Sequence, residues 1–154
     1  MKFLKKLMKI LRYTICITIA NDHRSKKKYF KALEYLQKAE KINPLLSEEL
    51  LVRSHVYMRL KEFTLSIKDA KSAIKMIKVR KKYSKYDRDY LIYFASRIGI
   101  TSQCGRDKIE PRFADQEFRK IRYEHIVITN VNKFILRDFP LKSNLDGDMR
   151  LFNQ

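Results

Sequence analysis

The sequence predicts an all-α protein that is built as a short stack of antiparallel helical hairpins. Three glycines and three prolines in 154 residues leave few places where a helix must break. A pattern of aromatic, small, aliphatic and alanine residues also recurs after 34 residues, as Tyr29, Ala32, Leu33, Ala39 and then Phe63, Ser66, Ile67, Ala73. A period of this length indicates hairpin units that stack on copies of themselves. Such stacks usually bind partners.

Composition and charge limit what the chain does. The 154 residues are most simply one domain, residues 1–154, that is long enough to bury a core. The formal net charge of +18 predicts an acidic protein, a nucleic acid or an anionic membrane surface as partner. Residues 1–44 carry twelve Lys and Arg against three acids, residues 45–99 carry thirteen against six, and residues 100–154 carry ten against eight. The positive charge therefore belongs to the first two-thirds of the chain.

The two cysteines, Cys16 and Cys104, are too few for a disulfide framework and belong to no CxxC pair. We expect buried free thiols in a reducing compartment, which favours a cytoplasmic protein. The chain also lacks the run of about 18 apolar residues that predicts a transmembrane helix.

Residues 1–12 predict an amphipathic basic helix. Its apolar face holds Phe3, Leu4, Leu7, Met8 and Leu11, and its basic face holds Lys2, Lys5, Lys6, Lys9 and Arg12. We expect this helix to dock on the helical core, and the alternative is that it lies in a membrane interface. A cleaved secretory signal fits less well, because Lys9 and Arg12 interrupt the apolar run, so we expect the segment to be retained.

The first predicted hairpin ends at Pro44, since proline cannot continue a helix. The packing face of its second helix holds Tyr29, Ala32, Leu33, Leu36 and Ala39. Its first helix, residues 13–26, is less clear, although Ile19 and Ala20 give a bulky residue followed by a small one. Small residues at such positions let two helix axes approach closely.

The second predicted hairpin begins at Ser47, the expected N-cap of its first helix. Glu48 and Glu49 then face the positive end of the helix dipole. Residues 61–62 form the turn, and the second helix presents Phe63, Ser66, Ile67, Ala70 and Ala73. We expect this helix to extend toward Lys82, because no proline ends it.

From residue 13 to about residue 80 the chain resembles a tetratricopeptide repeat protein with two units. The resemblance rests on the alanines and proline of the first unit and on the first helix of the second unit, which holds Leu50, Ser54, Tyr57 and Leu60. Four positions depart from the family pattern, namely Cys16, His23, Arg53 and Lys78. A plain helical bundle is the alternative architecture.

The resemblance implies a concave groove that is lined by the first helix of each unit. By position, its residues here are Ile17, Asn21, Arg24, Leu51, His55, Met58 and Arg59. Family members that hold chaperone tails place a lysine where Ile17 stands and an asparagine where Asn21 stands, so only Asn21 matches. The resemblance therefore implies a mixed apolar and cationic groove for another peptide or protein surface.

Beyond the second hairpin the sequence predicts additional helices that cap the stack. An aromatic-rich helix is expected to end at Gly99, and a loop to follow over residues 100–111. Residues 113–132 form a further helix, unless the β-branched run at residues 125–131 is a strand. The apolar residues that follow are expected to pack back as a cap, and residues 140–154 to form a tail.

The sequence shows no arrangement that indicates catalysis. His23, His55 and His125 are far apart, and none has a second ligand at metal-binding spacing. A Gly-rich phosphate loop and a nucleophile motif are both absent from the sequence. We therefore expect no enzymatic activity, no cofactor and no metal.

A basic stripe is predicted on the second helix of the second hairpin. It consists of Lys68, Lys71, Lys75, Lys78 and Lys82, at steps of three and four residues. This spacing aligns the lysines along one helix face, near Tyr83, Tyr86 and Tyr90. Cations beside aromatic rings are typical of single-stranded nucleic-acid binding, whereas lysines without arginines favour loose contact. The alternative is a solvated outer helix face.

These observations predict a small cytoplasmic interaction protein that binds an acidic or amphipathic partner protein. A dedicated immunity or adaptor protein would fit the size and the fold. One alternative is nucleic-acid binding through the basic stripe. The other is peripheral membrane attachment through residues 1–12.

Overall fold

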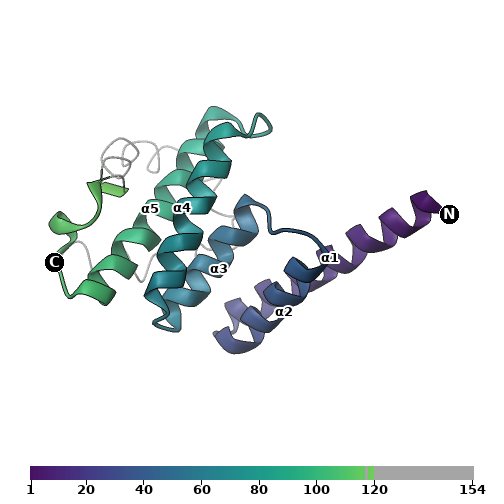
Figure 1. Ribbon diagram of the computed structural model, residues 1–154, viewed down its shortest axis with the longest axis horizontal. Coiled ribbons are helices and arrows are strands. Elements are labelled where there is room, and N and C mark those ends of the chain that lie inside the picture. Colours follow the sequence, from purple (N-terminus) through teal and green to yellow (C-terminus); the bar gives the residue numbers. More distant parts are fainter. Residues whose placement is uncertain (117, 120–154) are drawn as a thin grey trace.

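The computed structural model in Figure 1 describes residues 1–116, 118 and 119. These residues form five α-helices and one 3-10 helix: α1 (Lys2–Ser25), α2 (Tyr29–Ile42), α3 (Ser47–Arg59), α4 (Phe63–Val79), α5 (Lys85–Asp107) and η1 (Pro111–Phe113). Each α-helix packs against the next along the chain, and this part of the chain contains no strand. The prediction of an all-α stack is confirmed.

Small residues lie where the helices cross, as their spacing predicts. Four alanines are fully buried, namely Ala32 and Ala39 of α2 and Ala70 and Ala73 of α4. Side chains of this size allow neighbouring helix axes to approach closely. The alanine pattern therefore identifies the buried face of the second helix in each hairpin.

Three buried serines connect α3, α4 and α5. The Ser54 hydroxyl donates to the Ser66 carbonyl at 2.8 Å, and the Ser66 hydroxyl lies 2.8 Å from the Ser54 carbonyl. The Ser66 and Ser102 hydroxyl oxygens are also 2.8 Å apart. Because buried hydroxyls are costly unless they are hydrogen-bonded, these contacts fix how the three helices pack.

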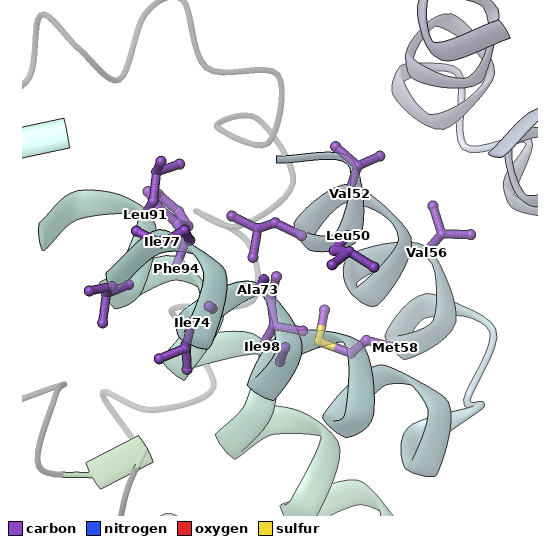
Figure 2. Close-up of a cluster of buried hydrophobic side chains, with 14 of the residues drawn as sticks. Leu50, Val52, Val56, Met58, Ala73, Ile74, Ile77, Leu91, Phe94 and Ile98 are labelled. Carbon is purple, nitrogen blue, oxygen red and sulfur yellow. The ribbon is translucent and has the colours of Figure 1, made fainter. Parts of the chain in front are cut away.

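Apolar side chains from α3, α4 and α5 form the main core. Figure 2 shows part of this cluster, including Val56, Ile74 and Ile98. Every residue from Tyr90 to Ile100 of α5 is buried. A helix at the surface of a protein normally leaves one face exposed, whereas α5 leaves no face exposed over this stretch.

Helix α5 is longer than expected, and the predicted loop over residues 100–111 is wrong up to Asp107. Gly99 and Gly105 are helical residues here, not helix breakers. A Cβ atom on Gly99 would lie 2.5 Å from the Phe118 ring, and one on Gly105 would lie 2.5 Å from the Phe63 ring. Both glycines therefore make room for aromatic rings from distant parts of the chain.

The start of α3 and the end of α4 also differ from their predicted positions. Ser47 is the first residue of α3 and not its N-cap, which is Leu46. The Ser47 hydroxyl does not cap the helix, because it bonds the Glu48 carboxylate at 3.0 Å and the Tyr83 hydroxyl at 2.7 Å. Helix α4 ends at Val79 and does not continue toward Lys82. The Lys82 ammonium instead pairs with Glu48 at 3.2 Å, which holds the turn after α4 against the start of α3.

Helix α1 runs without a break through the predicted boundary at residue 12. Its first half extends beyond α2, away from the other helices (Figure 1), and residues 1–12 are all exposed. The expectation that residues 1–12 dock on the core is therefore wrong for the part of the chain that the structure describes. Cys16 and Cys104 are free thiols and only half-buried.

The elements predicted for the last part of the chain lie largely outside the described residues. The helix predicted over residues 113–132 does not begin at Phe113, because Phe113 ends the 3-10 helix η1 and Ala114 is extended. The rest of that helix from residue 120, the alternative strand at residues 125–131, the cap that follows and the tail at residues 140–154 remain predictions. Before them, η1 and Phe118 are described, and the Phe118 ring is fully buried.

Candidate partner-binding site

The predicted groove residues of α3 lie mostly inside the stack. Leu51 and His55 have no exposed surface, and Met58 is 5% exposed. Helix α3 contacts α1, α2, α4 and α5, so little of its circumference is left for a partner. On α1, Ile17 and Asn21 are half-buried.

Three of the predicted residues nevertheless meet around one aromatic ring, where α1, α2 and α3 come together. The Tyr29 ring contacts the His55 ring edge-on at 6.4 Å between centroids, and the Arg59 guanidinium lies 5.7 Å from the centroid of Tyr29. Arg24 interacts electrostatically with the same tyrosine. We call Arg24, Tyr29, His55 and Arg59 the hairpin junction. Sequence reasoning placed three of these residues in the groove and used Tyr29 only as a packing residue.

Arg24 is the unusual member of the hairpin junction. It is 1% exposed, and its Nε and Nη1 atoms have no hydrogen-bond partner among the residues that the structure describes. Burial lowers the pKa of Arg24 to about 10, and Tyr29 opposes that shift only in part. No described carboxylate contributes to the shift. The guanidinium is therefore a buried cation without an acidic counterpart in this part of the protein.

Arg53, which is half-buried, shows how an arginine between helices is paired in this protein. Its Nε and Nη2 atoms donate to the two Asp69 carboxylate oxygens at 2.6 and 3.0 Å, and its Nη1 donates to Glu40 at 2.7 Å. Burial alone would lower the pKa of Arg53, but these hydrogen bonds hold it above its ordinary value. The sequence pattern marked Arg53 as a departure from the repeat, and the structure explains it as the tie between α2, α3 and α4. We call Arg53, Asp69 and Glu40 the ion-pair junction.

The chain around the hairpin junction adds positive potential. Lys26, Lys27 and Lys28 are exposed in the turn between α1 and α2, and only Lys26 has a described ion pair, with Asp22 at 2.8 Å. Helix α2 begins without a side-chain cap and without an acid in its first turn. The positive end of its dipole therefore remains uncompensated by described side chains and favours an anion.

The basic stripe is present in part. Lys68, Lys71, Lys75 and Lys78 are exposed along α4, as predicted, but Lys82 lies beyond the end of the helix. Lys71 pairs with Asp115 at 3.0 Å, and Lys82 pairs with Glu48.

Two of the aromatic residues expected beside the stripe, Tyr83 and Tyr90, do not offer free stacking faces. The Tyr83 hydroxyl bonds Ser47, and the Lys82 ammonium covers the Tyr83 ring at 5.0 Å. Tyr90 is 1% exposed. Because single-strand binding uses exposed rings, the combination of lysines and rings that suggested it is not formed by these two tyrosines.

Among the residues that the structure describes, no group of three His, Cys, Asp or Glu side chains could hold a metal ion, and His125 lies outside those residues. None of the described helices combines the length and the apolar character that crossing a membrane requires.

The chain was also compared with known proteins. No protein-family model matches it, and neither the curated proteins nor the solved structures contain a chain that matches it.

Proposed function

We propose that this chain is a non-enzymatic, tetratricopeptide-like binding protein that holds an acidic segment of a partner protein at the hairpin junction. The observation that carries the proposal is Arg24, a buried guanidinium with two nitrogens that lack a described hydrogen-bond partner. A buried charge normally has a counter-charge, because its removal from water is otherwise costly. A carboxylate of the partner would supply that counter-charge.

The position of the hairpin junction supports this function. Arg24 comes from the first helix of one hairpin and Arg59 from the first helix of the next, which matches the groove positions that the tetratricopeptide resemblance implies. Arg59 is exposed and therefore accessible to a partner, whereas Arg24 is buried and interacts with the same tyrosine. Arginine suits this role, since its planar group binds a carboxylate through two parallel hydrogen bonds.

Affinity capture from a native lysate tests the proposal with four proteins. They are the wild type, Arg24→Met, Arg59→Gln and a control, Lys68→Gln, which removes one exposed positive charge from the distant face of α4. We expect wild type and control to retain the same polypeptide at low salt. The two arginine variants should retain about tenfold less of it, which corresponds to the loss of one good charged contact.

Two results would contradict the proposal. The first is capture that the two arginine variants leave unchanged. The second is captured material that disappears after nuclease treatment or in the Lys68→Gln variant, which would indicate nucleic-acid binding through the basic stripe. Circular dichroism of each variant shows whether the helical fold is retained.

A further inference from the structure

The first half of α1 presents a continuous apolar surface to solvent. Six large apolar side chains among the first eleven residues are between 44% and 78% exposed, namely Phe3, Leu4, Leu7, Met8, Ile10 and Leu11. At about 100° per residue they occupy one arc of roughly 160° around the helix. The opposite arc holds only cations, which are Lys2, Lys5, Lys6, Lys9 and Arg12. No acid occurs before Asp22.

Most of this apolar arc faces away from the rest of the protein, and only its Leu4 and Met8 edge borders a hollow against Ile42 of α2. The second half of α1 buries Ala20 and Arg24. Since an α-helix has about 3.6 residues per turn, residues that are 18 apart lie directly in line. Lys2 is in line with Ala20, and Lys6 is in line with Arg24. The face that α1 uses to pack on its own protein therefore continues into the lysine face, and the apolar arc lies on the other side.

From residue 12 to residue 18 the apolar arc continues without adding a free polar group. Thr14 and Thr18 lie on it, and their hydroxyls donate to the carbonyls of Ile10 at 3.0 Å and of Thr14 at 2.9 Å. Hydroxyls that bond within their own helix leave the threonine methyl groups to face outward. Ile15, which is 47% exposed, lies on the same arc.

We propose that this surface binds anionic lipid bilayers, with α1 lying parallel to the membrane and its apolar arc inserted among the lipid chains. A wide apolar arc bordered by lysines is the pattern of an interfacial helix. The cations complement anionic headgroups, and the absence of acids before Asp22 leaves that attraction unopposed. The projection of this half of α1 beyond α2 (Figure 1) gives it room to lie on a flat surface. The inference does not depend on the hairpin junction, which uses other residues.

Vesicle flotation of the full chain tests the proposal. The vesicles contain either phosphatidylcholine alone or phosphatidylcholine with about one-third phosphatidylglycerol, a lipid fraction at which each basic residue adds attraction. We expect wild type to float mainly with the anionic vesicles. Leu7→Glu combined with Leu11→Glu should reduce the floated fraction at least about tenfold, because it places two charges in the inserted arc. The matched control is Phe30→Glu with Leu65→Glu, which makes the same charge change at exposed apolar residues of α2 and α4 and should float like wild type.

A fluorescent variant gives an independent measurement. The chain contains no tryptophan, so Phe3→Trp introduces a single reporter into the arc. Anionic vesicles should shift its emission to the blue, and brominated lipids should quench it.

The proposal is wrong if the Leu7/Leu11 variant floats as well as wild type, or if the Phe30/Leu65 variant loses flotation equally. It is also wrong if wild type fails to bind anionic vesicles but forms a dimer that the Leu7/Leu11 substitutions dissociate. That result would make a second copy of the chain the occupant of the arc.

Discussion

The ion-pair junction and the hairpin junction both place an arginine between neighbouring helices, but only at the ion-pair junction is the arginine paired with described carboxylates. At the ion-pair junction, Arg53 uses three nitrogens on two carboxylates from α2 and α4. At the hairpin junction, Arg24 is more deeply buried, and two of its nitrogens have no partner in the described part of the chain. A paired arginine holds helices together, whereas an unpaired one retains its capacity to bind an anion. The same residue type thus supports structure at one junction and, in our proposal, function at the other.

The largest expected effect is at the ion-pair junction. Arg53→Met leaves Asp69, which is 4% exposed, without its counter-charge. Removing one partner of a buried ion pair costs roughly 3 kcal/mol or more. We expect the free energy of unfolding, measured by urea denaturation, to fall by about that amount. Lys38→Met is the control, because its ion pair with Glu34 is exposed and should contribute little to stability. Equal losses in the two variants would show that Arg53 is not a structural tie.

The second test concerns the contact between Gly99 and the Phe118 ring, which depends on packing and not on charge. Alanine at a helical glycine is normally favourable by about 1 kcal/mol. At Gly99 a Cβ atom would meet the fully buried Phe118 ring, so we expect Gly99→Ala to destabilise the protein by about 1–3 kcal/mol. Gly105→Ala is the matched control, because the half-buried Phe63 ring has room to move and the loss should be smaller. Thermal unfolding measures the change in stability of both variants. A stabilised Gly99→Ala variant would contradict the close packing.

The local pattern of the sequence was enough to predict the hairpins. The spacing of Ala32 and Ala39 follows from the helical repeat itself, because residues seven apart lie on one face of a helix. The end of α5 was not predictable in this way. Gly99 and Gly105 look like helix breakers until the rings that fill their space, Phe118 and Phe63, are known from the fold.

The candidate site was predictable only in part. Position within the repeat grouped Arg24, His55 and Arg59, and the structure places all three near Tyr29. It did not reveal that Arg24 is buried and Arg59 exposed, because burial depends on how α1 and α2 pack against α3. The amphipathic pattern of residues 1–12 was also visible, but the direction of its apolar arc follows only from the face on which the second half of α1 packs.

The smallest expected change in the free energy of unfolding has the opposite sign, and it distinguishes Arg24 most clearly from Arg53. Arg24→Met replaces a buried cation by an apolar side chain of similar length. Since no described carboxylate loses a partner, the substitution removes a desolvation penalty and breaks no ion pair. We expect the free energy of unfolding of the isolated protein to stay the same or to rise by roughly 1 kcal/mol, in contrast to the loss for Arg53→Met. Urea denaturation of both variants side by side provides the measurement. A loss of about 3 kcal/mol for Arg24→Met would mean that this arginine is already paired within the chain, and the proposed role of the hairpin junction in binding an acidic partner would then fail.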